Sequence, residues 1–401
     1  MIPWTGLSLM LEDDFREAAA PLLAEGVVDV LEWSFDTGVR PMPEWAEALL
    51  DFYASEGRLL GHGVHYSPFS ARWENRQARW LEALDAELAR RPYAHVSEHY
   101  GFMTAAPFVR GAPLPVPRVT ASLRTGRDRL DRMRTVLGRH GRAALGLENL
   151  ALAWNRDEAL AHGACLDEVL TGDDDFIVLD VHNLYCQSEN FGISPEALLA
   201  TFPASRVREI HVSGGSALPA WPSDVEQKVR CDTHDHGVPQ AVLDLLEQAL
   251  ARFPEVRAVV FERLGGTIRS TEDAEDFRRD FRRIKARVDH ARPAAIAQRA
   301  HVSSSAVLPD ANEATLARFQ SALLVLLAED LPERAIRERL EADPAFAPFR
   351  DHVRSFDRGA LGIAARVVKK WGRRAPGHAM ERATSTRAAP PHRPRPSRPS
   401  G

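Results

Sequence analysis

Nine side chains of the types that bind metal ions stand at or near the ends of short apolar runs in this 401-residue chain. They are four histidines, four carboxylates and an asparagine: His62, His99, Glu148, Asp180, Asn183, His211, Asp232, His234 and Glu262. A single residue of this kind at a strand end is usually a hydrogen-bonded structural group. Burying all nine together would cost several kcal/mol for each ionisable group unless they were paired or bound to cations. The set therefore predicts a metal centre.

The number and type of these ligands constrain the metal. At about four to six ligands per ion, with open positions and bridging carboxylates counted, the set suits two or three metal ions. Imidazole and carboxylate ligands without a thiolate suit iron, zinc or manganese. Residue types alone do not choose among these metals.

Spacing along the chain indicates which ligands can share an ion. Alternate side chains of an extended segment point to the same side, so Asp232 and His234 can both reach one ion. Asp180 and Asn183 need a turn between them to do the same.

Two further residues are predicted to be catalytic beside the metals. Arg263 is a candidate for gripping a substrate carboxylate or peptide carbonyl, with a plain salt bridge as the alternative. His182 suits a hydrogen-bonding partner of a ligand. Glu32, at the end of the second predicted strand, fits a structural hydrogen bond, a role in holding the site open, or a contact with substrate.

Short apolar strands alternating with amphipathic helices predict the elements that position these residues. The predicted strands are Gly6–Met10, Val28–Trp33, Leu59–His65, His95–Tyr100, Ala143–Glu148, Phe176–Val181, Arg208–Val212 and Ala258–Glu262. Apolar residues three and four apart predict helices at Glu44–Tyr53, Trp80–Leu88, Pro195–Phe202 with Ser194 as N-cap, and Pro239–Phe253.

About eight such units in some 290 residues fit an α/β fold of the (β/α)8 TIM-barrel type, although a doubly wound sheet has the same local pattern. In a barrel, the carboxyl ends of all strands meet at the face where the chemistry collects. The polar residues at successive strand ends therefore favour the barrel.

The chain divides into three predicted parts. Residues 1–290 form the barrel, residues 305–371 a small helical domain, and residues 372–401 a basic Pro/Arg-rich tail that is predicted to be disordered. The helical domain contains predicted helices at Ala311–Glu329, Pro332–Leu340 and Asp357–Trp371. The leucine stripe around Phe319 is predicted to be core.

Composition excludes several classes of protein. A formal net charge of -5 gives no general attraction to nucleic acid. Three cysteines without paired spacing fit a reducing compartment. The N-terminus lacks the pattern of a signal peptide, and no apolar run approaches the roughly 20 residues of a membrane span. We expect a cytoplasmic protein that binds neither nucleic acid nor membrane.

Seven ordered segments between roughly residues 5 and 275 resemble the DUF692 family, the multinuclear non-heme iron-dependent oxidases that include the catalytic subunit of methanobactin biosynthesis. The segments are His62-Gly-Val64, Ser97-Glu-His99, Leu147-Glu-Asn149, Leu179-Asp-Val-His-Asn183, Glu209-Ile-His211, Asp232-Thr-His-Asp-His236 and Phe261-Glu-Arg263. The resemblance implies a TIM barrel with two or three irons, held by the nine residues named above. It also implies that dioxygen is used to modify cysteine residues of a ribosomally made precursor peptide. A small partner protein that binds the precursor's leader is implied too, and a separate chain or the helical domain could fill that role.

The chain departs from the family pattern at two places. Many members have Arg-Asp after the last glutamate, whereas this chain has Arg263 and Leu264. Relatives often have Gly-Val-Gly-Leu-Ser after the first histidine, whereas His65 and Tyr66 stand here. The metal set is intact, but the edge of the pocket differs.

The residues leave two other functions open. One is a divalent-metal-dependent hydrolase or sugar isomerase of the same barrel class, resembling xylose isomerase or the three-zinc endonucleases. An acidic barrel argues against a nuclease, which needs a basic mouth for phosphate. The other is a scaffold for a peptide-maturation complex that lacks turnover. Redox-active iron would favour the oxidase, and zinc, magnesium or manganese the hydrolase or isomerase.

Overall fold

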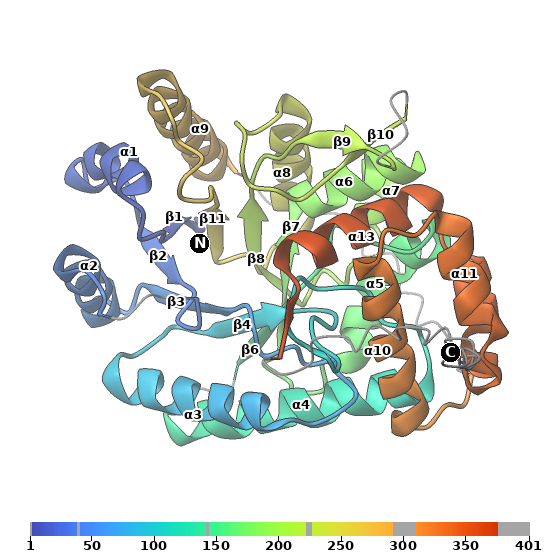
Figure 1. The fold of residues 1–401 in the computed structure, drawn as a ribbon. Coiled ribbons are helices and arrows are strands. Elements are labelled where there is room, and N and C mark those ends of the chain that lie inside the picture. The colour runs from blue at the N-terminus through green and yellow to red at the C-terminus, as the bar shows by residue number, and fades with distance from the viewer. Residues whose placement is uncertain (1, 38–40, 142–143, 222–226, 292–308, 376–401) are drawn as a thin grey trace, which may run out of the picture.

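The computed structural model describes residues 2–37, 41–141, 144–221, 227–291 and 309–375 (Figure 1). Eight parallel strands close into a barrel in the order β1-β11-β8-β7-β6-β4-β3-β2. Their bounds are β1 (Trp4–Ser8), β2 (Val30–Trp33), β3 (Leu59–Gly63), β4 (Val96–His99), β6 (Leu145–Glu148), β7 (Phe176–Asp180), β8 (Val207–Val212) and β11 (Ala258–Phe261). Each predicted strand overlaps one of these, and the (β/α)8 prediction is confirmed.

Helices cover the outside of the barrel between successive strands (Figure 1). They are α1 (Asp13–Ala24), α2 (Glu44–Ser55), α3 (Asn75–Arg90), α4 (Thr120–Arg139), α5 (Arg156–Val169), α6 (Val181–Phe191), α7 (Pro195–Leu199), α8 (Gln240–Arg252) and α9 (Thr271–His290). Ser194 caps α7 as predicted, because its side chain accepts a hydrogen bond from the Ala197 amide. Helix α6 follows β7 without a loop, so Asp180 is both the last strand residue and the N-cap of the helix.

The barrel interior changes from apolar to polar along the strands. Val30, Leu60, Ala258 and Val260 form a small buried cluster inside the barrel. Glu32, His62 and Glu262 follow these cluster residues by two positions, after Val30, Leu60 and Val260 respectively. Alternate residues of a strand share a face, so these polar side chains also point inwards, one layer nearer the carboxyl end.

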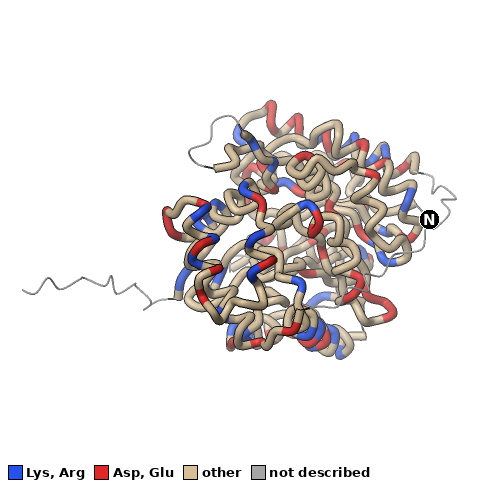
Figure 2. The backbone as a smooth tube through the Cα atoms, turned by 90° about the vertical axis from the view of Figure 1, so that its right-hand side faces the viewer, with Lys and Arg blue, Asp and Glu red and all other residues tan. Residues whose placement is uncertain are grey.

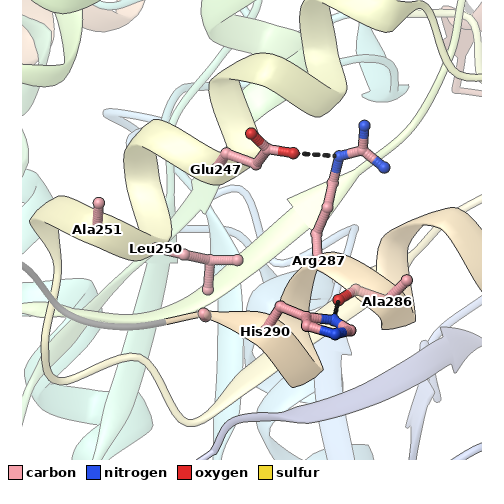
Figure 3. A pocket seen from close by; sticks show the side chains of 7 residues that line it. Glu247, Leu250, Ala251, Ala286, Arg287 and His290 are labelled. Atoms are coloured by element: carbon pink, nitrogen blue, oxygen red, sulfur yellow. Dashed lines mark hydrogen bonds and ion pairs between the residues drawn. The ribbon is translucent and has the colours of Figure 1, made fainter.

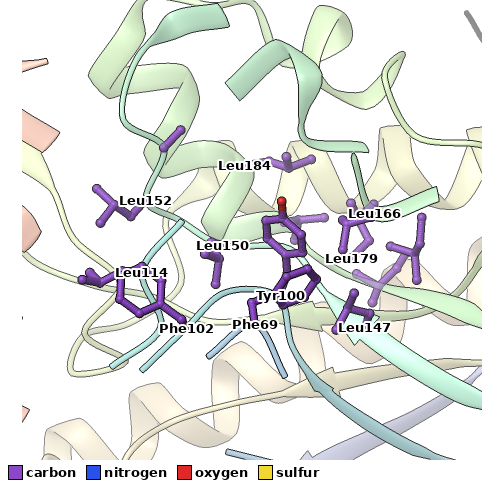
Figure 4. Packing of buried hydrophobic residues seen from close by; sticks show 14 of the residues in the cluster. Phe69, Tyr100, Phe102, Leu114, Leu147, Leu150, Leu152, Leu166, Leu179 and Leu184 are labelled. Atoms are coloured by element: carbon purple, nitrogen blue, oxygen red, sulfur yellow. The ribbon is translucent and has the colours of Figure 1, made fainter. Parts of the chain in front are cut away.

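The opposite faces of the same strands build the outer core (Figure 4). Leu147 and Leu179, each next to an inward-facing ligand, are fully buried there. Phe69 and Tyr100 from the loops after β3 and β4 pack edge to face in this core, with ring centroids 4.7 Å apart. These closely packed, buried side chains hold the strand ends and their loops in fixed positions.

The helical region beyond the barrel comprises α10 (Glu313–Ala328), α11 (Glu333–Ala342), the 3-10 helix η1 (Pro344–Phe349), α12 (Arg350–Arg354) and α13 (Arg358–Trp371). The predicted stripe of α10, with Leu316, Phe319, Leu323 and Leu327, is fully buried and is core.

This region packs against loops at the carboxyl end of the barrel. Buried Gln320 of α10 accepts a hydrogen bond from Ala71 N at 2.9 Å and donates one to Phe69 O at 2.8 Å. Trp154, in the loop after β6, stacks on Phe356 at 4.3 Å between ring centroids. Helices α10 to α13 therefore border the carboxyl end of the barrel.

Four short strands form two ribbons outside the barrel: β5 (Phe108–Arg110) with β12 (Arg373–Arg374), and β9 (Ala217–Pro219) with β10 (Lys228–Arg230). Strand β12 belongs to the first residues of the predicted tail. The rest of that tail, residues 376–401, lies outside the described residues, as does the segment 292–308 between the two predicted domains.

The distribution of charged residues and the hydropathy of the helices agree with what the composition predicts. Lys and Arg are interspersed with Asp and Glu over the described elements (Figure 2). Among the described helices, none combines the length and apolar character needed to cross a bilayer.

Candidate metal centre

Strand register brings predicted ligands side by side. His99 of β4 is the direct partner of Glu148 on β6, and Asp180 of β7 is the direct partner of His211 on β8. Glu262 follows the last residue of β11, whose neighbour is again β8. Since all these strands are parallel, the side chains converge at one end of the barrel, as predicted.

The first group of ligands is His62, His99 and Glu148. Glu148 Oε2 lies 3.1 Å from His62 Nε2 and 3.3 Å from His99 Nε2. The other ring nitrogens are already engaged, His62 Nδ1 with Ser97 Oγ at 2.7 Å and His99 Nδ1 with Gly63 O at 3.1 Å. A carbonyl only accepts, so His99 donates from Nδ1 and offers the lone pair of Nε2 to the centre.

His211 links this group to the next. Its Nδ1 lies 3.6 Å from both Glu148 Oε1 and Glu262 Oε1, while its Nε2 lies 3.1 Å from Glu32 Oε2. The two oxygens of Glu148 thus face different positions, one beside His62 and one beside His211. A carboxylate placed in this way can bridge two cations.

The third group stands between β7 and the loop after β8. His234 Nε2 lies 2.6 Å from Asp232 Oδ1, and its Nδ1 lies 3.7 Å from Glu262 Oε2. Asp180 Oδ1 accepts a hydrogen bond from Asn183 N at 2.6 Å. This helix-capping contact places Asp180 and Asn183 on the first turn of α6.

The prediction that Asp232 and His234 lie on an extended segment is wrong. The segment is an irregular loop, and His234 has a φ of 50°, in the left-handed region. Such a backbone costs about 1–2 kcal/mol for a residue other than glycine. The two side chains still meet, but with His234 in the left-handed region rather than through the alternation of a strand.

Unpaired buried atoms test whether metal ions fit. Glu148 Oε2, Asp180 Oδ2, Asn183 Oδ1 and His211 Nδ1 are buried without a hydrogen-bond partner within the described part of the chain. Each such atom costs about 1–3 kcal/mol when left unsatisfied. All four belong to predicted ligands and all can donate a lone pair to a cation, so the donor set fits metal ions.

Three overlapping groups place their ligand atoms within 4.8 Å of one another: His62 with Glu148 and His211, Glu32 with His211 and Glu262, and Asp180 with His234 and Glu262. His211 and Glu262 are each shared by two groups. Overlapping groups that share residues are the arrangement expected of a centre in which ions share ligands.

The pKa shifts of the buried groups show that nearby positive charge stabilises the carboxylates. Burial would raise the pKa of Glu148, but His99, His211 and His62 outweigh burial and hold that pKa well below its ordinary value. Burial would lower the pKa of His99, but Glu148 and Glu98 raise it to about 10. Divalent cations would supply the same compensation without protons on the imidazoles.

A similar balance holds in the third group. Burial opposes protonation of His234, but Asp232 and Glu262 raise its pKa to about 10. Burial and the charges of Asp232 and Glu148 together raise the pKa of Asp180 well above its ordinary value. A cation at this position would allow Asp180 to ionise.

Comparison with known proteins identifies the family of this chain. A family model described as the RiPP precursor modification enzyme MbnB/TglH/ChrH, where RiPP denotes a ribosomally made and modified peptide, matches residues 16–283. The chain belongs to this family. The DUF692 resemblance is thereby confirmed.

Similar sequences include several that are named UPF0276 protein. One from Anaeromyxobacter sp. (strain Fw109-5) is 30% identical over 238 residues, covering 55% of this chain and 79% of the relative. One from Caulobacter vibrioides is 29% identical over 264 residues, covering 64% of this chain and 87% of the relative.

Similar solved structures include an L-ribulose 3-epimerase at 12% identity and a TM-score of 0.45, covering 72% of this chain and 95% of that one. An IOLI protein with a zinc atom is 14% identical with a TM-score of 0.47, covering 72% of this chain and 99% of that one.

Of the two predicted catalytic residues, His182 contacts a predicted ligand, whereas the Arg263 side chain contacts Thr267. His182 is fully buried, with Nδ1 3.4 Å from Asp232 Oδ1, and it suits a residue that orients that ligand. Arg263 is also buried and donates from Nε to Thr267 Oγ1 at 2.9 Å and from Nη2 to Thr267 O at 3.2 Å. Its contact with substrate stays a prediction.

Sequence reasoning left three buried residues near the centre without a defined role. Glu32 contacts His211, and Glu209 Oε1 lies 3.6 Å from the same imidazole nitrogen. Asn149 accepts from Asp180 N at 2.7 Å and fixes the end of β7. Glu209 could have been found, because it precedes His211 by two residues and therefore shares its inward face.

The predicted ligands differ in their exposure to solvent. The side chains of Asp232, His99 and His234 are 32%, 21% and 18% exposed, whereas the other predicted ligands are buried. A substrate would therefore reach the centre from the side of β4 and the loop after β8.

A separate hollow of about 490 Å³ lies between α8 and α9 on the outside of the barrel (Figure 3). An ion pair of Glu247 with Arg287 at 2.9 Å crosses it. None of the nine predicted ligands lines it, so it is distinct from the metal centre.

Proposed function

We propose that this chain is a multinuclear non-heme iron oxidase that uses dioxygen to modify cysteine residues of a ribosomally synthesised precursor peptide. The observation that carries the proposal is the continuous chain of imidazole and carboxylate donors in which Glu148 faces two ligand groups. Membership of a family of precursor-peptide modification enzymes supports a peptide substrate.

The protein's contribution is to orient donors and to exclude water. When bound, iron supplies a ligand position for a substrate thiolate and a redox partner for dioxygen, which no side chain offers. Ser97 and Gly63 orient the rings of His62 and His99 so that Nε2 of each faces Glu148. Burial of His211 and Glu262 keeps bulk water from the inner part of the centre.

The exposed side of the centre is the proposed entry for the peptide. His99 borders it on one side, and Asp232 with His234 borders it on the other. All three cysteines of the chain are free, which suits the reducing cytoplasm, where a precursor's thiols also stay reduced. Leader recognition is assigned either to a separate small protein or to the region α10 to α13.

The test is direct conversion of a peptide. Full-length protein is reconstituted anaerobically with ferrous iron and mixed with the cysteine-containing peptide encoded beside its gene, together with any small partner encoded there. Admission of oxygen should change the peptide's mass and block its cysteines to alkylation. A peptide with serine in place of cysteine should stay unchanged.

Matched variants define the role of the centre. Glu148→Gln should abolish conversion, whereas Glu82→Gln, at an exposed position of α3, should convert the peptide at the wild-type rate. An unchanged peptide mass with wild-type protein, iron, oxygen and partner all present would refute the oxidase. Zinc, magnesium or manganese in the site would then favour a hydrolase or isomerase.

A further inference from the structure

A small basic surface stands where the C-terminal helical region meets the barrel. Strands β5 and β12 pair antiparallel there, with Arg373 opposite Arg110 and Arg374 opposite Phe108. Figure 1 shows the chain leaving α13 and running back over the barrel. We call residues 108–110 together with 370–374 the basic ribbon.

The cations of the basic ribbon lack acidic partners. Among the described residues, no carboxylate lies within ion-pair distance of Arg110, Lys370, Arg373 or Arg374. Arg373 Nη1 donates to Lys370 O at 3.1 Å, Lys370 Nζ lies 4.7 Å from the centroid of the Trp371 ring, and Arg374 Cζ lies 5.1 Å from that of Phe108. By contrast, Lys369 one residue earlier is paired with Asp330 at 2.7 Å.

This arrangement is unfavourable on its own. Like charges at opposite positions of paired strands destabilise the pair, and the backbone register, which is irregular after Arg373, sets Arg373 opposite Arg110. Two large apolar side chains of the ribbon, Val109 and Trp371, are also exposed, at 41% and 44%. A bound partner with carboxylates and some apolar surface would relieve both features.

The basic ribbon is connected to the metal centre. Arg110 Nη2 lies 2.6 Å from His65 Nε2, and His65 follows the ligand His62 by three residues in the same strand and loop. Asp36 is the acid on the other side of His65, where it accepts the His65 amide at 2.6 Å. A chain lying along the ribbon therefore has a short route to the centre.

We propose that the basic ribbon binds an acidic, extended segment of the substrate peptide and so directs its cysteine-bearing part towards the centre. The inference rests on the proposed function and names the recognition surface for it. A peptide suits the ribbon better than nucleic acid does, because the exposed Val109 and Trp371 offer apolar contacts to peptide side chains and the family modifies precursor peptides. Four cations in a chain of net charge -5 are also few for a phosphate backbone.

The test measures binding without turnover. Full-length, iron-loaded protein is titrated under nitrogen into a fluorescein-labelled 12-residue peptide of alternating Glu and Val, and binding is followed by fluorescence anisotropy. The same peptide with Gln for Glu is the charge control. We expect the Glu peptide to bind at least tenfold more tightly, and raising salt from 50 to 200 mM to weaken it severalfold.

Charge reversal locates the surface. Arg373→Glu with Arg374→Glu should weaken the Glu peptide at least tenfold, and the milder Arg373→Gln with Arg374→Gln should weaken it about threefold. Arg334→Glu with Arg339→Glu on α11 makes the same change in net charge at exposed positions of the same helical region and should leave binding within twofold. Unaltered thermal melts establish that each variant is folded.

Three results would overturn the inference: equal binding of the Glu and Gln peptides, equal weakening by the α11 variant, or tighter binding of a 12-nucleotide single strand of DNA than of the Glu peptide. Conversion of a precursor peptide by a protein that fails this binding test would leave the oxidase standing without the ribbon. Binding of the Glu peptide without conversion of any precursor peptide would leave the ribbon standing without the oxidase.

Discussion

The Glu148 carboxylate joins the parts of the metal centre. Its two oxygens lie between 3.1 and 3.6 Å from imidazole nitrogens of His62, His99 and His211. Those rings come from three different strands of the barrel. A residue that connects so many others should have a large effect when it is changed.

Glu148→Gln should lower the iron retained per chain by at least one ion. The amide has nearly the same shape, but it presents one oxygen in place of two and cannot bridge two cations as a carboxylate does. Elemental analysis of the protein after desalting measures this. Glu82→Gln, exposed on α3, is the control, and equal iron in both variants would contradict the bridging role.

Glu32 should act by holding His211. Its Oε2 lies 3.1 Å from His211 Nε2, which leaves Nδ1 to face the carboxylates of Glu148 and Glu262. Removing such a partner of a ligating histidine typically costs 10–100-fold in metal affinity. Glu32→Ala should show this loss in competition with a chelator. Glu32→Gln retains an acceptor and should lose less. A wild-type affinity in Glu32→Ala would contradict the orienting role of Glu32.

At the scale of the elements, the sequence was most informative about strands. Runs such as Phe176–Leu179 are apolar throughout because both faces are covered, and this property is visible without a structure. The polar residue at the end of nearly every run from the third onward then marked the carboxyl end of the barrel. What joins the ligands across strands is register, and nothing in the order of residues reveals that His99 is level with Glu148.

The loop after β8 shows where reasoning from local pattern fails. An extended segment would place Asp232 and His234 on one side, and the structure reaches the same result through a left-handed residue at His234. Tertiary contacts with Glu262 and His182 fix this loop, and they come from distant parts of the chain. Local spacing correctly indicated that the two side chains lie close together but gave the wrong backbone.

Helix α10 should depend on Gln320 for its attachment to the barrel. Gln320→Leu would leave Ala71 N and Phe69 O without their hydrogen bonds in a buried place. We expect a loss of about 2–4 kcal/mol in the free energy of unfolding, measured with urea. Arg318→Ala, on the exposed side of the same helix, should change it by less than about 0.5 kcal/mol. An equal loss of unfolding free energy in both variants would contradict the role of Gln320 in attaching α10 to the barrel.

At the scale of the whole molecule, the centre should make stability depend on pH when metal is absent. The pKa values of His99 and His234 are raised to about 10 in the folded protein from an ordinary 6.5. A raised pKa contributes stability that is complete below about pH 6.5 and is lost as the pH rises towards 10. The metal-free protein should therefore lose at least about 2 kcal/mol between pH 6.5 and 9.5.

Metal should remove this dependence. Ligating imidazoles carry no proton at the donor nitrogen, so the metal-loaded protein has little to lose over the same range. Urea unfolding at several pH values, with and without metal, measures both curves. A flat curve for the metal-free protein would mean that the histidines are not held in their protonated state by the carboxylates.

The central claim is that the barrel holds two or three irons, and metal content tests it most directly. Protein purified without added metal would be examined by elemental analysis, and a sample reconstituted with iron-57 by Mössbauer spectroscopy. The account predicts two or three irons per chain in nitrogen and oxygen coordination. Zinc or magnesium filling the site, with no bound iron even after anaerobic reconstitution, would contradict it.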